Sequence, residues 1–160
     1  MLRVAQPLIS LVIPIFNGEA ILAESLSRVK SFLETSGLDA EVVVVDDGSS
    51  DDTPEIIEAF GGEGVRGIRL AENRGKFAAL KAGMAEARGR CRIFTDADVP
   101  YELEAVPHMA NLLLEQGFHI VVGDRTLPDS EAGARQPALR RLGTRVFSFS
   151  VRMLVTGELF

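Results

Sequence analysis

Two short apolar runs constrain the fold of this chain most strongly. Residues 8–16 (LISLVIPIF) carry no charge and are rich in β-branched side chains, which predicts a strand that is buried on both faces. Residues 41–45 (EVVVV) predict a second buried strand. Strands of this kind are typical of parallel sheets that are covered by helices, so the two runs indicate an α/β fold.

Segments with helical spacing alternate with these strands. Leu22, Leu26, Val29 and Leu33 recur at helical intervals, and Gly37 is placed to end that helix. Either Asp52 or Thr53 is expected to cap the next helix. Phe77, Leu80, Met84 and Ala87 are expected on one face of a third helix, and residues 102–116 predict a fourth. The five expected strands cover residues 8–16, 41–45, 65–70, 91–95 and 119–123. This alternation predicts a three-layer α/β sandwich with a mainly parallel sheet.

Polar residues follow every expected strand. Right-handed crossovers bring the carboxyl ends of parallel strands to one edge of the sheet, which is where open α/β sheets bind ligands. Ordinary polar turns are the alternative interpretation, but the abundance of Asp favours a metal-binding or nucleotide-binding edge. These residues are Asn17, Asp46, Asp47, Asn73, Asp96, Asp98, Asp124 and Arg125.

Asp96 and Asp98 directly follow the fourth expected strand and are separated by one residue. Side chains alternate along a strand, so carboxylates at positions i and i+2 are expected to point the same way. A divalent cation with oxygen ligands would satisfy two such charges. The spacing therefore suggests a metal site, and a polar turn remains the alternative.

Charge divides the chain into an acidic body and a basic end. Residues 1–134 hold 22 acidic and 12 basic residues, whereas residues 135–160 hold five Arg and one Glu. An acidic body argues against nucleic-acid binding, and the basic end is expected to meet an anionic partner. The chain has neither GxGxxG after its first strand nor GxxxxGK[ST], which argues against dinucleotide and P-loop sites. The single Cys91 is expected to be a small buried apolar residue.

Five motifs in order resemble a known family. They are residues 12–19 (VIPIFNGE), 44–49 (VVDDGS), 73–76 (NRGK), 96–98 (DAD) and 123–125 (GDR). Together they resemble the nucleotide-sugar domain of family 2 (GT-A) inverting glycosyltransferases, especially the dolichyl-phosphate β-glucosyltransferases and, more loosely, the dolichol-phosphate mannose synthases. The resemblance implies a GT-A (Rossmann-like) fold, with residues 1–134 as the nucleotide-sugar-binding part of the domain.

The resemblance implies roles on the donor side of such a site. Pro14 and Glu19 lie where the family's first loop holds the base and ribose. Asp47, with Asp46 beside it, lies where a carboxylate reads the base. Lys76 belongs to a loop that faces the nucleotide. The implied donor is a UDP-sugar or a GDP-sugar.

The resemblance also implies the metal ligands and the acceptor side. Asp96 and Asp98 match the pair that holds Mg²⁺ or Mn²⁺ on the diphosphate, and Asp98 is counted with the catalytic residues. Arg125 matches an Arg near the transferring sugar and the acceptor phosphate, and Arg140 or Arg141 matches a second Arg on that phosphate. The family's pattern continues beyond the last residue with a further acceptor-side segment, so the domain is expected to be incomplete there.

Residues 135–160 predict a basic amphipathic helix on the acceptor side. An Arg stripe beside a broad apolar face is typical of a helix that lies in a membrane interface, and a helix packed on the sheet with its Arg side chains outward is the alternative. The resemblance favours the interface, because the acceptor in that family is a polyprenyl phosphate, and the chain is then expected to be a peripheral protein on the cytoplasmic face of a membrane. The stripe consists of Arg141, Arg145, Ser148 and Arg152, and the apolar face of Leu142, Val146, Phe149 and Met153.

The resemblance implies an enzyme that transfers a hexose, expected to be glucose from UDP-glucose, to a polyprenyl (dolichyl-type) phosphate with inversion. A GDP-mannose-dependent enzyme of the same fold is the first alternative. A nucleotide-binding module without catalysis and a metal-dependent nucleotidyltransferase are the others.

Overall fold

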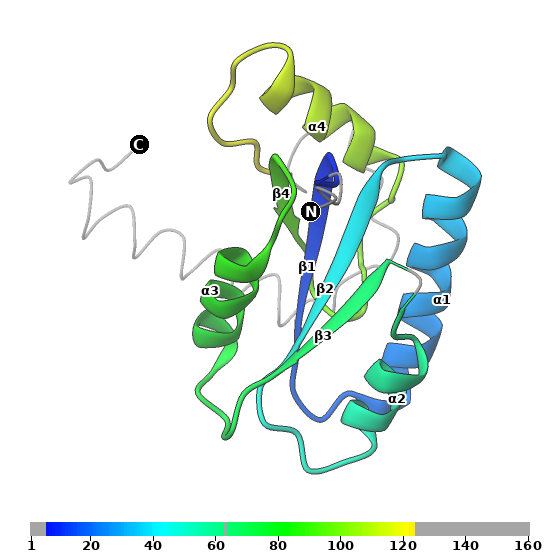
Figure 1. Cartoon of the computed structure of the whole chain (residues 1–160), viewed down its shortest axis with the longest axis vertical. Helices are drawn as coiled ribbons and strands as arrows, with labels where there is room; N and C mark the ends of the chain where they lie inside the picture. Colours follow the sequence, from blue (N-terminus) through cyan, green and yellow to red (C-terminus); the bar gives the residue numbers. More distant parts are fainter. Residues whose placement is uncertain (1–5, 63, 124–160) are drawn as a thin grey trace, which may run out of the picture. The chain divides into compact units, whose positions relative to one another are not determined.

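The computed structural model describes residues 6–62 and 64–123 (Figure 1). The chain divides into two compact units, residues 1–121 and 122–160, and every described helix and strand belongs to the first. The elements are β1 (Ile9–Ile15), α1 (Glu19–Ser36), β2 (Ala40–Asp46), α2 (Thr53–Ala59), β3 (Val65–Arg69), α3 (Lys76–Glu86), β4 (Cys91–Phe94) and α4 (Ala105–Leu114).

The four strands form one parallel sheet in the order β3-β2-β1-β4. The chain runs outward from β1 through β2 to β3, and α3 then carries it back past β1 to β4. Helix α3 packs on the face of the sheet that contains Val12, Val43 and Val45. Helices α1, α2 and α4 pack against the opposite face, as Figure 1 shows. The predicted three-layer α/β sandwich with a parallel sheet is confirmed for the described residues.

The core is built on β1 and β2, as their apolar sequences predict. All seven residues of β1 and six of the seven residues of β2 are buried. Ile13 packs on the α1 side with Leu22 and Leu26, and all three are at most 1% exposed. Full burial of side chains of this size contributes about 1.5–3 kcal/mol each, so this strand pair is the main source of stability for the fold.

Helix α3 packs through smaller residues than its sequence suggests. Ala79 and Gly83 are its buried positions, whereas Phe77 is 80% exposed. A Cβ on Gly83 would lie 2.5 Å from Val12 Cγ1 and 2.7 Å from Val45 Cγ2, so the helix approaches the sheet too closely for a larger side chain there. Phe77 lies two residues before Ala79, about 200° around the helix. The prediction that Phe77 belongs to the buried face of this helix is therefore wrong.

The expected fifth strand, residues 119–123, is not a strand. Ile120 and Val122 are each 79% exposed. An apolar alternating segment becomes a strand only where a neighbouring strand completes its hydrogen bonds. Within the described residues, β4 pairs with β1 alone, and residues 119–123 pair with no strand. The pattern of a segment does not by itself show whether a neighbouring strand is available to it.

A buried polar network at the amino end of the sheet was not predicted. The Ser10 hydroxyl donates to Glu41 Oε1 (2.7 Å), and the Arg88 N–H donates to the same oxygen (2.7 Å). Arg66 Nη2 lies 3.4 Å from Glu41 Oε2, and the Gly89 N–H donates to the Ser10 hydroxyl (2.7 Å). Burial raises the pKa of Glu41, but the hydrogen bonds from Arg88 and Ser10 and the charge of Arg66 outweigh it, so the pKa lies below its usual 4.5. Glu41 is therefore an ionised, fully partnered carboxylate inside the fold.

We expect Glu41→Gln to destabilise the fold by about 1.5–3 kcal/mol near neutral pH, because it removes charge-assisted hydrogen bonds. A lowered folded-state pKa gives stability that is present above the unfolded-state pKa and is lost as pH falls through the folded-state value. Urea unfolding from neutral to acidic pH should therefore show an acid-dependent loss that is smaller in the variant.

Glu86→Gln is the matched control, because the Glu86 carboxylate lies 3.8 Å from the same Arg66 but is 64% exposed. Its effect should stay within about 0.5 kcal/mol. Equal effects of the two substitutions would contradict the assignment of stability to the buried network.

Candidate functional site

Strands β1 and β4 separate at the carboxyl edge of the sheet, and Pro14 marks the point. The Cys91 N–H donates to the Leu8 carbonyl (3.0 Å) and the Thr95 N–H to the Val12 carbonyl (3.1 Å). The backbone N–H and C=O groups of the even-numbered residues of β1 therefore point toward β4. Pro14 is the next such residue, and it has no N–H to continue the ladder. The strand order also reverses between β1 and β4, which is where open α/β sheets bind ligands. Pro14 itself is buried in β1.

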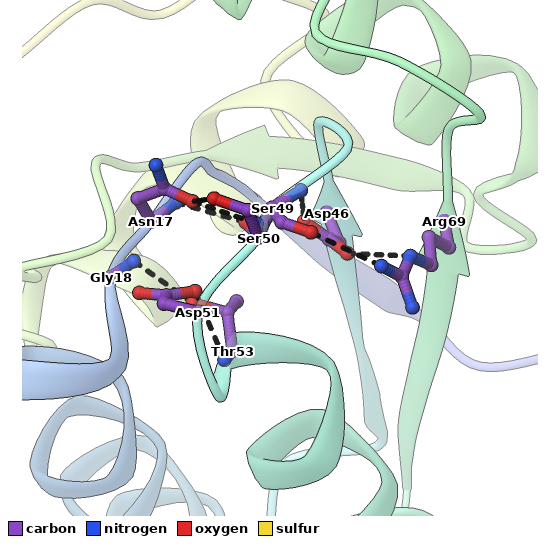
Figure 2. Close-up of polar contacts among 8 residues, drawn as sticks. All are labelled: Asn17, Gly18, Asp46, Ser49, Ser50, Asp51, Thr53 and Arg69. Carbon is purple, nitrogen blue, oxygen red and sulfur yellow. Dashed lines mark hydrogen bonds and ion pairs between the residues drawn. The ribbon is translucent and has the colours of Figure 1, made fainter.

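The loops after β1 and β2 are joined by hydrogen bonds in both directions (Figure 2). The Asn17 N–H donates to the Ser49 hydroxyl (2.9 Å), and the Ser50 N–H donates back to Asn17 Oδ1 (2.9 Å). The Gly18 N–H donates to the Thr53 hydroxyl (2.9 Å). Asn17 has a φ of 48°, a left-handed conformation that Asn tolerates better than most residues. The two loops therefore form one rigid unit.

Glu19 and Asp51 cap each other's helices. The Glu19 N–H donates to Asp51 Oδ2 (3.1 Å), and the Asp52 N–H donates to Glu19 Oε2 (3.0 Å). The other oxygen of Asp51 accepts from the Thr53 N–H (3.1 Å). Burial raises the pKa of Asp51, but hydrogen bonds from Thr53 and the Glu19 N–H outweigh it and hold the pKa below its usual range. Asp52 holds the N-cap position of α2 but makes no side-chain capping bond. Asp51, and not the expected Asp52 or Thr53, accepts the hydrogen bond at the start of this helix.

Asp46 is 1% exposed and pairs with a residue that sequence reasoning missed. Its Oδ1 accepts from the Ser49 N–H (2.8 Å). Its Oδ2 lies 3.3 Å from Arg69 Nε as an ion pair, without hydrogen-bond geometry, and accepts no hydrogen bond from any described residue. Arg69 is 60% exposed, and its Nη2 donates to the Ser49 carbonyl (3.1 Å) (Figure 2). The sequence offered one signal for Arg69, since it is a basic residue at the end of β3, the strand that pairs with β2.

Asp47 uses both of its oxygens to hold the loop that precedes α3. Oδ1 accepts from the Arg74 N–H (2.9 Å) and Oδ2 from the Gly75 N–H (2.7 Å). The two loops touch beside this clamp, since a Cβ on Gly48 would lie 2.5 Å from the Glu72 carbonyl carbon. Gly48 has a φ of 72°, so glycine suits both the conformation and the close approach.

Lys76 and Asp96 form an ion pair across the edge. Lys76 is the first residue of α3, and Asp96 follows β4. Their side chains are 61% and 48% exposed. The structure thus brings together two residues, 20 positions apart, that the sequence motifs singled out separately.

Asp96 and Asp98 lie in a turn and not in a strand. Strand β4 ends at Phe94, and the Val99 N–H donates to the Asp96 carbonyl (3.0 Å). Strand alternation is therefore the wrong reason to expect the two carboxylates on one side. Val99 closes the turn with a φ of 42° and is 1% exposed. This conformation costs a β-branched residue about 1–3 kcal/mol, and core packing of Val99 holds it in place.

The pair has the right chemistry for a hard divalent cation. Both residues offer carboxylate oxygens, and Asp98 is exposed, which suits Mg²⁺ or Mn²⁺. No group of three His, Cys, Asp or Glu side chains within the described residues could hold a metal alone. A cation held by these two carboxylates would take its remaining ligands from water and from phosphate oxygens, as Mg²⁺ usually does.

The predicted acceptor-side residues Arg125, Arg140 and Arg141 lie outside the described residues, as does the expected helix at residues 135–160. In the described part of the chain, no helix combines the length and the apolar content needed to cross a bilayer. His108 and His119 are both exposed.

We expect Asp51→Ala to lower the midpoint of thermal unfolding by several degrees, because two backbone N–H groups at helix starts lose their acceptor. Asp52→Ala should leave the midpoint almost unchanged, since Asp52 makes no side-chain capping bond. Circular dichroism melting of both variants beside the unmodified chain provides the measurement. A larger effect at Asp52 than at Asp51 would contradict the capping assignment.

Comparison with known proteins gives a consistent result. A family model described as "Glycosyl transferase family 2" matches residues 10–158. An undecaprenyl-phosphate 4-deoxy-4-formamido-L-arabinose transferase of Shewanella sediminis is 37% identical over 133 residues, 81% of this chain and 40% of that protein. A dolichyl-phosphate beta-glucosyltransferase of Drosophila melanogaster is 33% identical over 159 residues, 89% of this chain and 48% of its own length. The chain thus spans less than half the length of these curated relatives.

Solved structures share the fold. The mannosyltransferase PcManGT from Pyrobaculum calidifontis, in complex with GDP-Man and Mn²⁺, aligns with a TM-score of 0.55 and 25% identity over 69% of this chain and 32% of its own. Residues 1–349 of S. aureus TarS align with a TM-score of 0.55 and 27% identity, over 65% of this chain and 32% of that one. A complex of the same TarS fragment with UDP aligns with a TM-score of 0.50 and 30% identity, over 56% and 27%.

Proposed function

We propose that this chain, which belongs to glycosyl transferase family 2, forms the donor side of a polyprenyl-phosphate sugar transferase. The family predicted from the motifs is confirmed. Two relatives with lipid-phosphate acceptors in their names support the acceptor class. Because the chain covers 40–48% of the length of those relatives, the activity, the substrates and the partners of the whole protein are part of the proposal.

The observation that carries the proposal is the Asp96–Val99 turn at the edge where β1 and β4 separate, with the Lys76 ammonium against it. A diphosphate leaving group develops negative charge that cations stabilise. Asp96 and Asp98 would hold Mg²⁺ or Mn²⁺, which would supply most of that stabilisation. A neighbour of known structure is in complex with GDP-Man and Mn²⁺, which supports this metal class. Lys76 lies within reach of the same diphosphate and adds a fixed positive charge.

The proposed reaction needs no strong general base. An oxygen of the lipid phosphate attacks the anomeric carbon while the bond from that carbon to the diphosphate oxygen breaks, and attack from the opposite face inverts the configuration. A phosphate monoester is largely ionised near neutral pH, since its second pKa is about 6. The exposed His108 and His119 are therefore given no catalytic role. Arg125 and Arg140 or Arg141 are proposed to hold the acceptor phosphate, because arginine matches phosphate geometry.

We assign the nucleoside to the Asp46–Arg69 pair. Both oxygens of Asp47 already accept backbone hydrogen bonds, whereas one oxygen of Asp46 accepts none, and Arg69 beside it is exposed. Glu19 and Pro14 then have supporting roles. The Glu19 carboxylate caps α2, and Pro14 ends the hydrogen-bond ladder between β1 and β4. UDP-glucose is the proposed donor. The relative with formamido-arabinose in its name and the neighbour bound to GDP-Man define the competing sugars and bases.

Titration calorimetry of the chain with UDP, UDP-glucose and GDP, each with and without Mn²⁺, tests the donor site. We expect UDP-glucose to bind only with Mn²⁺, and Asp98→Asn to weaken that binding at least about 10-fold. Asp39→Asn is the control, because Asp39 is exposed at the amino end of β2, opposite the site. Tighter binding of GDP would move the assignment to a mannose donor, and full binding by Asp98→Asn would contradict the metal site.

A polyprenyl phosphate lies in a membrane, so we also propose that the protein sits peripherally on a cytoplasmic membrane surface through residues 135–160. The support is sequence composition, since this segment holds five Arg and one Glu. Flotation with vesicles that contain anionic lipids should recover the chain at low salt and lose it at high salt. Arg145→Glu should reduce the recovered fraction, whereas Arg90→Glu, in the acidic body, should not. Equal recovery with neutral vesicles would contradict an electrostatic contact.

A further inference from the structure

Lys76 forms an ion pair with Asp96, one of the two carboxylates that are proposed to bind the metal ion. Its ammonium group pairs with Asp96 Oδ1. The paired oxygen belongs to one of the two carboxylates that are proposed to hold the metal. A cation that binds Asp96 in the ligand-free chain therefore competes with an ammonium that is already present.

The backbone that leads into Lys76 is held by hydrogen bonds. Asp47 is 2% exposed and accepts hydrogen bonds from the Arg74 and Gly75 N–H groups, at 2.9 and 2.7 Å. The Gly75 N–H also donates to Asn73 Oδ1 (3.1 Å), and Gly75 has a φ of 87° directly before α3 begins. Three acceptor atoms thus fix the loop that leads into Lys76, and the Lys76 side chain reaches Asp96 from the end of that loop.

We propose that Lys76 holds the place of the divalent cation on Asp96 until a nucleotide diphosphate arrives, and that Asp47 positions Lys76 for this role. The proposal rests on the proposed donor site and adds a competition between two cations for one carboxylate. Without nucleotide, the metal must displace the Lys76 ammonium. With nucleotide, the ammonium can pair with phosphate oxygens instead, so Asp96 becomes available to the metal.

This exchange couples the two ligands. Because coupling is reciprocal, Mn²⁺ should raise the affinity for UDP by the same factor as UDP raises the affinity for Mn²⁺. The placeholder keeps the carboxylate partnered in the free chain and makes metal binding depend on the donor. Removal of any positive charge beside Asp96 would strengthen metal binding by electrostatics, so the loss of the enhancement by UDP is the result specific to the placeholder.

The test is Mn²⁺ affinity, measured by electron paramagnetic resonance of free Mn²⁺ with and without UDP. Lys76→Met keeps the length of the side chain and removes its charge. Without UDP, we expect the Lys76→Met protein to bind Mn²⁺ at least about 5-fold more tightly than the unmodified chain. The factor by which UDP raises its Mn²⁺ affinity should be smaller by a similar amount. Lys76→Arg should restore the unmodified behaviour, because a guanidinium also pairs with a carboxylate.

Two further variants make the result specific. Lys81→Met removes an exposed positive charge from the same helix and should change Mn²⁺ affinity less than about 2-fold, because charges at the surface are screened. Asp47→Asn keeps one acceptor oxygen for two N–H groups, so it should shift Mn²⁺ affinity in the same direction as Lys76→Met but by less. An Asp47→Asn protein with unmodified Mn²⁺ affinity would overturn the positioning role.

Unchanged or weaker Mn²⁺ binding by Lys76→Met, in a background where UDP enhances Mn²⁺ binding to the unmodified chain, overturns the placeholder and leaves the donor site intact. No UDP-dependent Mn²⁺ binding by the unmodified chain, shown to be folded by circular dichroism, overturns both the donor site and this inference.

Discussion

Every residue of β1 and all but the first of β2 are buried, so this parallel pair can hold polar side chains only where their hydrogen bonds are satisfied. Ser10 and Glu41 meet that condition at the amino end, and Asp46 meets it in part at the carboxyl end. Helices pack on both faces of the sheet and exclude water from these strands. Chemistry that needs solvent access is thereby confined to the ends of the strands.

At the carboxyl end, three loops form one hydrogen-bonded unit. Asn17 links the loops after β1 and β2, and Asp47 links the second of these to the loop before α3. The motif residues thus divide into two kinds. Buried carboxylates hold backbone N–H groups in place, and the exposed side chains of Arg69, Lys76 and Asp98 are left to meet a ligand. The loop backbone at such a site keeps its geometry through short buried side chains, while the longer exposed side chains are free to adjust to a ligand.

The sequence predicted the strands that are buried on both faces, because continuous β-branched runs leave little alternative, and it predicted the end of α1 at Gly37, which has a φ of 64°. It failed where the outcome depends on contacts between distant segments. The exposure of Phe77 follows from the close approach at Gly83, and residues 119–123 pair with no strand in the described part of the chain. In the site, motif spacing identified Asp96 and Lys76 but not their pairing. Arg69 was missed because a lone basic residue at the end of a strand has no distinctive pattern.

The Ser10–Glu41–Arg66 network and the Asp46–Asp47 loop lie at opposite ends of the same strands. Energetic effects at well-separated sites with no shared partners are usually additive. Stability can then be engineered at the amino end, for example by substitutions that strengthen the support for Glu41, without altering ligand contacts. A chain stabilised there would tolerate costlier substitutions at the carboxyl edge, which makes the amino end the natural starting point for redesigning donor specificity.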